Sequence, residues 1–160
     1  MSYRTGIGYD IHRTLPGQAL VLGGVEISAP FGLSGHSDAD VVLHAVCDAL
    51  LGAAGLGDIG ELFPDTDPRF SGADSRVFVA EVLDRIRSAG FRVVNLDVII
   101  HAQRPRLGPH KHQIRQALAE MLELPTGSIG VKATTNEGLG AIGRGEAIAC
   151  WATVLLESAS

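Results

Sequence analysis

The stretch Ala147-Ile148-Ala149-Cys150-Trp151-Ala152-Thr153-Val154-Leu155 decides the fold, because it is almost entirely apolar. An apolar run of this length without regular polar alternation is typical of a strand that is buried on both faces. The contacts that bury this strand come either from the core of the chain or from an oligomer interface. We therefore expect a sheet at the centre of the molecule.

Further strands are expected at residues 3–13, 91–100 and 129–135. In the first of them, Ile7, Tyr9 and Ile11 alternate with glycine and polar residues, so this apolar face can pack into the core. Residues 19–27 consist of two short apolar runs joined by Gly23-Gly24, which predicts a hairpin with a tight turn.

Apolar side chains recur at helical spacing in residues 42–53, 78–86 and 114–122. Ser37 or Asp38 can cap the first helix, which Gly55 ends, and Gly90 and Pro125 end the other two. Because strands and helices alternate along the chain, the sequence predicts one α+β domain over residues 1–160. Its mixed sheet carries the helices on one face.

Composition sets further limits on function. The chain has 160 residues, of which 46% are hydrophobic, and a net charge of −5 without any run of lysine and arginine. This charge argues against nucleic acid or a membrane as a partner and favours a small molecule. Cys47 and Cys150 lie in apolar patterns without a second cysteine nearby, which indicates reduced thiols. With no signal core and no membrane-spanning run, we expect a cytoplasmic protein.

Asp10, His12 and His44 are candidate metal ligands. In a strand, Asp10 and His12 point to the same side, and the first helix carries His44. One aspartate and two histidines suit zinc, and three protein ligands leave an open position for substrate. Alternatively, Asp10 and His12 form the end of a strand, and His44 is an ordinary hydrogen-bonded helix residue.

Three polar, glycine-rich loops are longer than a connection requires. Residues 57–68 combine carboxylates and prolines, which suits hydroxyl or cation recognition or an acidic surface loop. Residues 102–108 carry two cations, which suits a base edge, a phosphate or an ordinary connection. Residues 132–146 hold hydroxyls and Glu137, which suits a diphosphate with a hard metal, or a flexible hairpin. The glycines in this last loop match neither a P-loop nor a dinucleotide fingerprint.

Taken together and in this order, six motifs resemble those of the 2-C-methyl-D-erythritol 2,4-cyclodiphosphate synthase family, and they span nearly the whole chain. They are Tyr9-Asp10-Ile11-His12, His36-Ser37-Asp38-Ala39-Asp40, Leu51-Gly52-Ala53-Ala54-Gly55-Leu56-Gly57-Asp58-Ile59-Gly60, Phe63-Pro64-Asp65-Thr66-Asp67, Lys132-Ala133-Thr134-Thr135 and Gly143-Arg144-Gly145-Glu146. The resemblance implies a homotrimer whose core is formed by the sheets and whose active sites lie between neighbouring subunits. It also implies one zinc ion per site, with magnesium or manganese on the substrate diphosphate.

The resemblance further implies roles for individual residues. Asp10, His12 and His44 would bind zinc, Glu137 would bind the second metal, and His36 and Thr135 would stabilise the transition state. The implied substrate-binding residues are Asp10, Ile11, His12, His36, Ser37, Asp58, Ile59, Gly60, Phe63, Pro64, Asp65, Thr66, Asp67, Ala102, Gln103, Arg104, Pro105, Arg106, Leu107, Gly108, Ala133, Thr134, Thr135, Asn136, Glu137, Ala141 and Arg144. Of these, residues 102–108 would form the cytidine pocket, and Ala141 and Arg144 would border an apolar cavity on the three-fold axis.

The implied reaction belongs to the non-mevalonate (methylerythritol phosphate) pathway of isoprenoid precursor biosynthesis. In it, 4-diphosphocytidyl-2-C-methyl-D-erythritol 2-phosphate becomes 2-C-methyl-D-erythritol 2,4-cyclodiphosphate with release of CMP. The 2-phosphate attacks the β-phosphorus, so the enzyme is a cyclising phosphorus–oxygen lyase. Two alternatives remain: a zinc-dependent phosphohydrolase, in which the same ligands activate water, and a non-catalytic trimeric nucleotide-binding protein.

Overall fold

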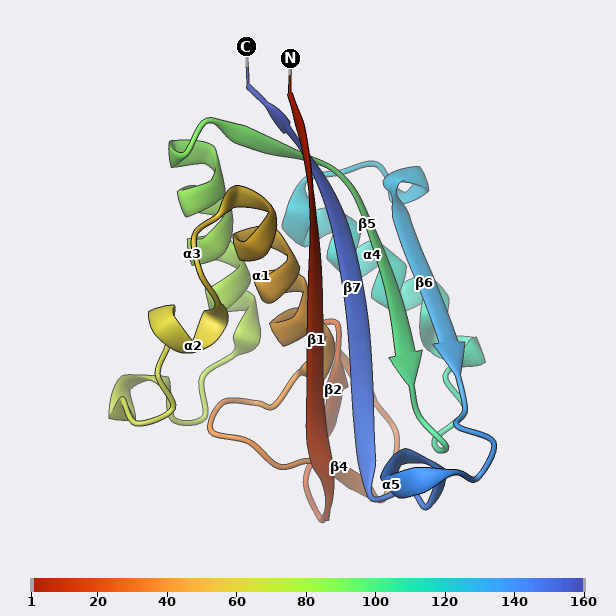
Figure 1. Ribbon diagram of the computed structural model, residues 1–160. Coiled ribbons are helices and arrows are strands. Elements are labelled where there is room, and N and C mark those ends of the chain that lie inside the picture. The colour runs from red at the N-terminus through yellow and green to blue at the C-terminus, as the bar shows by residue number, and fades with distance from the viewer. Residues whose placement is uncertain (1, 160) are drawn as a thin grey trace.

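The computed structural model describes residues 2–159. Its main sheet is formed by β1 (Tyr3–Pro16), β4 (Phe31–Leu33), β5 (Phe91–His101), β6 (Ile129–Thr134) and β7 (Ala147–Ser158). The strand order is β4-β1-β7-β5-β6, and every neighbouring pair is antiparallel except β5 and β6, which are parallel (Figure 1). A separate hairpin is formed by β2 (Leu20–Leu22) and β3 (Val25–Ile27). The sheet is therefore mixed, as expected.

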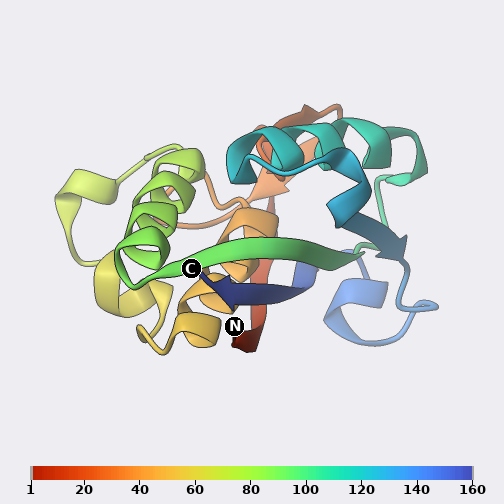
Figure 2. The ribbon, with the colours of Figure 1, turned by 90° about the horizontal axis from the view of Figure 1, so that it is seen from above.

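Three long helices, α1 (Val41–Ala54), α3 (Ser75–Ser88) and α4 (Lys111–Leu122), lie on one face of the sheet (Figures 1 and 2). Short helical turns are α2 (Ile59–Leu62), η1 (Pro68–Phe70), η2 (Gly108–His110), η3 (Thr126–Ser128) and α5 (Gly140–Gly143). The predicted α+β class with helices on one face is confirmed. No helix among residues 2–159 is long and apolar enough to cross a membrane.

Strand β7 occupies the middle of the sheet, as its apolar sequence suggested. It pairs along its length with β1 on one side and β5 on the other, so Cys150 stands between Asp10 and Ile100. Residues 147–150 are buried, but Trp151 is 41% exposed and Thr153 is exposed as well. Within one chain the core therefore buries only one face of this second half, because the helices cover only one face of the sheet, and burial of the other face in an oligomer interface stays a prediction.

The two faces of β1 are reversed relative to the prediction. Ile7 and Tyr9 are 63% and 42% exposed, and with Ile11 they lie on the open face of the sheet. The opposite side of β1 carries Gly6 and Gly8, which pack directly against α1. The absence of side chains at these glycines is what lets α1 approach the backbone of β1. Asp10 and His12 share this glycine side and therefore face the helix.

Helix α1 begins after Asp40, so the prediction of Ser37 or Asp38 as its N-cap is wrong. The buried Asp40 carboxylate accepts hydrogen bonds from the amides of Val42 and Leu43, and also from Gly23 and Gly24 in the β2–β3 turn. Burial raises the pKa of Asp40 to about 6, although the amides of Gly23, Gly24 and Leu43 oppose the shift. Asp40 thereby fixes the start of α1 to the hairpin.

The remaining expectations are mostly confirmed. Gly23 and Gly24 both have positive φ, 62° and 76°, as a primed two-residue hairpin turn requires. Gly55 ends α1 in the left-handed conformation. Cys47 and Cys150 are buried free thiols. Two loops contain more structure than predicted, because α2 lies within residues 57–68, η1 begins at Pro68, and α5 lies within residues 132–146.

Candidate functional site

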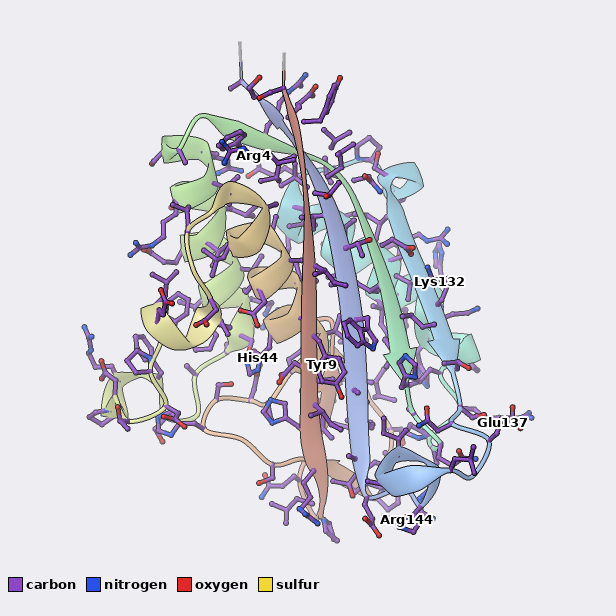
Figure 3. All side chains as sticks on the ribbon, in the orientation of Figure 1. Arg4, Tyr9, His44, Lys132, Glu137 and Arg144 are labelled. Carbon is purple, nitrogen blue, oxygen red and sulfur yellow. The ribbon has the colours of Figure 1, made fainter. Side chains whose placement is uncertain are left out.

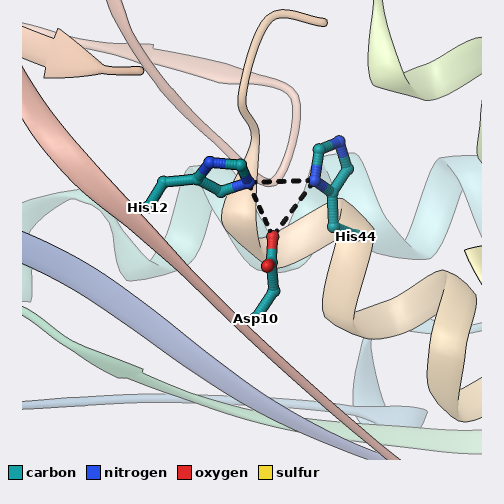
Figure 4. A group of neighbouring side chains, drawn as sticks. All are labelled: Asp10, His12 and His44. Atoms are coloured by element: carbon teal, nitrogen blue, oxygen red, sulfur yellow. Dashed lines mark hydrogen bonds and ion pairs between the residues drawn. The ribbon is translucent and has the colours of Figure 1, made fainter. Parts of the chain in front are cut away.

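The structure brings Asp10, His12 and His44 together at the junction of β1 and α1 (Figure 4). Asp10 Oδ2 lies 2.9 Å from His12 Nε2 and 3.1 Å from His44 Nδ1. The two imidazole nitrogens are 3.2 Å apart. Three potential metal-binding atoms thus form a nearly equilateral triangle, which we call the metal triad.

The triangle has the dimensions of a metal-binding face. In a tetrahedral zinc site, ligand atoms about 2.0–2.1 Å from the ion lie about 3.3 Å from one another. The metal triad is only slightly tighter than this, and three protein donors would leave one position of a tetrahedral ion open. The chemistry of the donors and their spacing therefore both fit a divalent ion such as zinc.

The charges within the metal triad also favour ligation. Burial would raise the pKa of Asp10, but hydrogen bonds and charges from His12 and His44 outweigh it and hold this pKa well below its usual range. For His12, burial lowers the pKa, and the hydrogen bond and charge of Asp10 raise it above its usual value. Asp10 is consequently ready to bind a cation at neutral pH, and at His12 Nε2 a metal ion competes with a proton that Asp10 favours.

Hydrogen bonds on the far sides of both rings determine which nitrogens face the metal triad. His12 Nδ1 donates to the carbonyl of Ser34 at 2.8 Å, so His12 Nε2 faces Asp10. His44 Nε2 lies 3.0 Å from Ser75 Oγ and 3.1 Å from Ser37 Oγ, so His44 Nδ1 faces Asp10. Outer hydrogen bonds of this kind commonly orient metal-binding histidines.

A cleft of about 510 Å³ opens beside the metal triad. Besides Asp10, His12 and His44, it is lined by Gly35, His36, Ser37, Ile59, Gly60, Phe63, Pro64, Asp65, Phe70 and Phe78. We call it the triad cleft. His36 is held at its rim, where Nε2 donates to the carbonyl of Asp67 at 3.0 Å. Residues from two segments expected at the substrate, 36–37 and 59–65, thus line the same cleft as the metal triad.

Several other candidate residues lie around the triad cleft without lining it. Asp58 caps α2 through the amide of Glu61, and Asp67 binds Arg69, with Oδ2 2.6 Å from Nη2. Ile11 points its side chain to the open face of the sheet, away from the cleft. The lining residues that the sequence did not identify are Gly35, Phe70 and Phe78, whose apolar and glycine signals are those of any core or loop.

A second cleft, of about 320 Å³, lies at the carboxyl ends of β5 and β6. It is lined by Ala102, Gln103, Pro105, Arg106, Leu107, Gly108, Pro109, Ala133, Thr134 and Thr135. We call it the loop cleft. It gathers most of the predicted cytidine and diphosphate residues and adds Pro109. Arg104 does not line it, because its guanidinium lies over the ring of Phe31.

The predicted diphosphate loop follows directly from β6. Glu137 is exposed and has a positive φ of 52°, an uncommon conformation for a residue other than glycine. Asn136 Oδ1 lies 3.3 Å from His101 Nδ1, which fastens the loop to the end of β5. Farther along, Arg144 forms an ion pair with Glu146, with Nε and Oε1 2.8 Å apart, and Ala141 is exposed.

Within one chain, the metal triad and Glu137 do not meet. Strands β7 and β5 separate β1 from β6, so three strand spacings, or about 14 Å, lie between the two strands that position them. Figure 3 shows His44 on the helix side near β1 and Glu137 beyond the end of β6. The two clefts are therefore separate in the single chain.

Comparisons with known proteins match the whole length of this architecture. A family model described as the YgbB family matches residues 3–157. A 2-C-methyl-D-erythritol 2,4-cyclodiphosphate synthase from Nostoc sp. is 54% identical over 158 residues, which cover 99% of this chain and 96% of the relative.

Two solved structures are similar in fold as well as in sequence. One is the bifunctional IspDF from Campylobacter jejuni, with a TM-score of 0.94 and 44% identity, covering 98% of this chain but only 42% of that larger protein. The other is a 2C-methyl-D-erythritol-2,4-cyclodiphosphate synthase in a CDP-bound form. It has a TM-score of 0.89 and 42% identity, covering 96% of this chain and 100% of the other.

Proposed function

Because the chain belongs to the YgbB family, whose curated relatives are 2-C-methyl-D-erythritol 2,4-cyclodiphosphate synthases, we propose that its two clefts divide one cyclisation reaction between them. The chain is a cyclising lyase of the non-mevalonate pathway. It converts 4-diphosphocytidyl-2-C-methyl-D-erythritol 2-phosphate to the 2,4-cyclodiphosphate and releases CMP. The observation that supports the division is the metal triad beside a cleft that also presents His36 and Ser37.

The metal triad would hold zinc through Asp10 Oδ2, His12 Nε2 and His44 Nδ1. Bound there, zinc supplies Lewis-acid chemistry to a phosphate oxygen. The support is the spacing of the three atoms and the outer hydrogen bonds that direct these particular nitrogens inward. Glu137, on its exposed loop, would hold magnesium or manganese together with substrate oxygens, because magnesium usually takes few protein carboxylates.

The reaction itself explains why these residues include no catalytic base. The attacking 2-phosphate is anionic near neutral pH, and the leaving group, CMP, is also a phosphate, so neither must exchange a proton to react. The barrier comes from repulsion between phosphates and from bending the substrate into a ring. His36, Ser37 and Thr135 would donate hydrogen bonds to phosphate oxygens. The two clefts would hold the two ends of the substrate.

A complete site would require two chains. The substrate diphosphate must contact both the metal triad and the Thr135–Glu137 segment, yet these lie at opposite edges of β1-β7-β5-β6. A neighbouring chain that turns its loop cleft toward this chain's triad cleft would resolve the separation. The exposed apolar side chains of Ile7, Tyr9 and Trp151 support sheet-to-sheet packing between chains. We infer a homotrimer with three shared sites, in which residues 102–108 of one chain hold the cytidine.

The reaction would take place in the cytoplasm, a proposal supported by the two buried free thiols.

The proposed function is tested by incubating the purified protein with the substrate, zinc and magnesium. We expect CMP and a cyclic diphosphate whose mass corresponds to substrate minus CMP. Release of CMP with a linear product that is one water heavier would instead establish a phosphohydrolase. Bound zinc with no turnover would establish a binding protein.

A further inference from the structure

We propose that Ser75 and Asp38 are positioning residues for the metal triad, which hold His44 in the orientation and tautomer that present Nδ1 to the metal. This inference rests on the proposed metal triad and extends it outward by two residues. Neither serine nor aspartate touches Asp10 or His12. Their effect on the metal would pass entirely through the imidazole of His44.

Ser75 is well placed to act on His44. It is the first residue of α3, it is fully buried, and its Oγ lies 3.0 Å from His44 Nε2. Asp38 holds Ser75 in two ways: its Oδ2 accepts the Ser75 amide at 3.0 Å, and its Oδ1 accepts a short hydrogen bond from the Ser75 hydroxyl. The backbone amide and the hydroxyl of Ser75 are thus both held by the carboxylate of Asp38.

The direction of these hydrogen bonds sets the tautomer of His44. An ionised carboxylate only accepts hydrogen bonds, so the Ser75 hydroxyl proton must point to Asp38. The oxygen of Ser75 then offers a lone pair to His44, and Nε2 must carry the proton of a neutral ring. His44 Nδ1, which lies 3.1 Å from Asp10 Oδ2, is then the nitrogen that would offer its lone pair to a bound metal ion. This is the state in which a histidine binds a metal ion.

The segment 36–38, which carries Asp38, is joined by two backbone hydrogen bonds to residues 72–73, which precede α3. The Asp38 amide donates to the carbonyl of Ala73 at 3.0 Å, and the Gly72 amide donates to the carbonyl of His36 at 2.7 Å. One turn along α3 from Ser75, the ring of Phe78 lies 6.2 Å from that of His44, measured between centroids. The imidazole therefore has a polar support and an aromatic support from the same helix.

His12 offers a useful contrast. Its outer nitrogen donates to a backbone carbonyl, that of Ser34, which no side-chain substitution removes. The outer support of His44 is instead made of side chains, because Ser37 also lies within 3.1 Å of Nε2. Ser37 Oγ is already an acceptor for the amide of Ala39 and is not bonded to a carboxylate. Ser75 is therefore the residue whose removal should release the ring.

The inference is tested by measuring zinc affinity in competition with a chelator for the wild type, Ser75→Ala, Ser75→Thr and Asp38→Asn. We expect Ser75→Ala and Asp38→Asn to weaken affinity by about 10- to 100-fold, the usual effect of removing such outer partners. Ser75→Thr keeps the hydroxyl and should recover most of the affinity. Ser88→Ala, at the exposed opposite end of α3, is the matched control and should equal the wild type.

Melting of the metal-free proteins separates positioning from a purely structural role. Positioning predicts that the rise in Tm on adding zinc shrinks in Ser75→Ala. A Ser75→Ala variant with a lower metal-free Tm but with zinc affinity within about twofold of wild type would overturn the inference. An Asp10→Ala variant that binds zinc as tightly as the wild type would instead contradict the metal triad itself. The two failures are therefore distinguishable.

Discussion

Gly8 of β1 lies so close to Ala45 of α1 that a Cβ added at Gly8 would be 1.9 Å from the Ala45 carbonyl oxygen. This contact fixes the distance between the strand that carries Asp10 and His12 and the helix that carries His44. We therefore predict that Gly8→Ala lowers the free energy of unfolding by about 3 kcal/mol, because the backbone must move to admit the methyl group. Chemical denaturation measures this change.

The same substitution should also weaken metal binding in whatever fraction stays folded, since it moves β1 away from α1. Gly127→Ala is the control, because nothing lies within 4 Å of a Cβ at Gly127. Equal stability of the two variants would show that β1 and α1 are not held by this contact.

His44→Ala is predicted to abolish stoichiometric zinc binding and to lower kcat by about 100-fold or more, since a tetrahedral site would lose one of three protein ligands. His44 is only partly buried, so circular dichroism and oligomer mass should stay those of the wild type. Metal content by elemental analysis and CMP release are the two measurements. Full turnover in a demonstrably zinc-free variant would rule out the role of the metal triad.

The pH dependence of metal affinity follows from His12. The pKa of His12 is raised above 6.5 because the hydrogen bond and charge of Asp10 outweigh burial. A metal ion competes with the proton for Nε2, so affinity should be constant well above this pKa and fall as the pH drops through it. Chelator competition between about pH 6 and pH 8 measures the slope. Affinity that does not change over this range would contradict the assignment of His12 as a ligand.

Asp40 links the start of α1 to the β2–β3 turn through four backbone amides. Asp40→Ala leaves these buried donors without acceptors, and we predict a loss of about 2–4 kcal/mol in the free energy of unfolding. Asp40→Asn should cost less, because an amide oxygen can replace Oδ1, which accepts three of the four bonds. Equal losses for the two substitutions would contradict this account, because they would show that the hydrogen bonds to Oδ1 add nothing that a neutral amide oxygen can replace.

Local features were predictable from the sequence when one kind of signal dominated. The paired glycines at 23–24 specify a turn that few other residues can form, and the alternation of strands and helices specifies the α+β class. The metal triad followed from the two-residue spacing of Asp10 and His12 and from the helical pattern that carries His44, and the family resemblance implied the same three ligands.

Features that depend on contacts between distant segments were not predictable. The apolar alternation of β1 suggested that Ile7, Tyr9 and Ile11 face the core, whereas the glycines opposite them permit the closest helix packing. Ser75 carries no signal in the sequence, because a serine at the start of a helix is ordinary. The separation of the two clefts follows from strand order, which periodicity does not encode.

The central claim is that a complete active site takes its metal triad from one chain and its loop cleft from another. Co-expression of His44→Ala with Glu137→Ala tests it most directly, with each variant also measured alone. If trimers with shared, head-to-tail sites mix randomly, about one site in four would combine an intact triad with an intact neighbouring Glu137. We predict that the mixture recovers about 25% of wild-type CMP release while each variant alone is nearly inactive. A mixture no more active than its two components would contradict the claim.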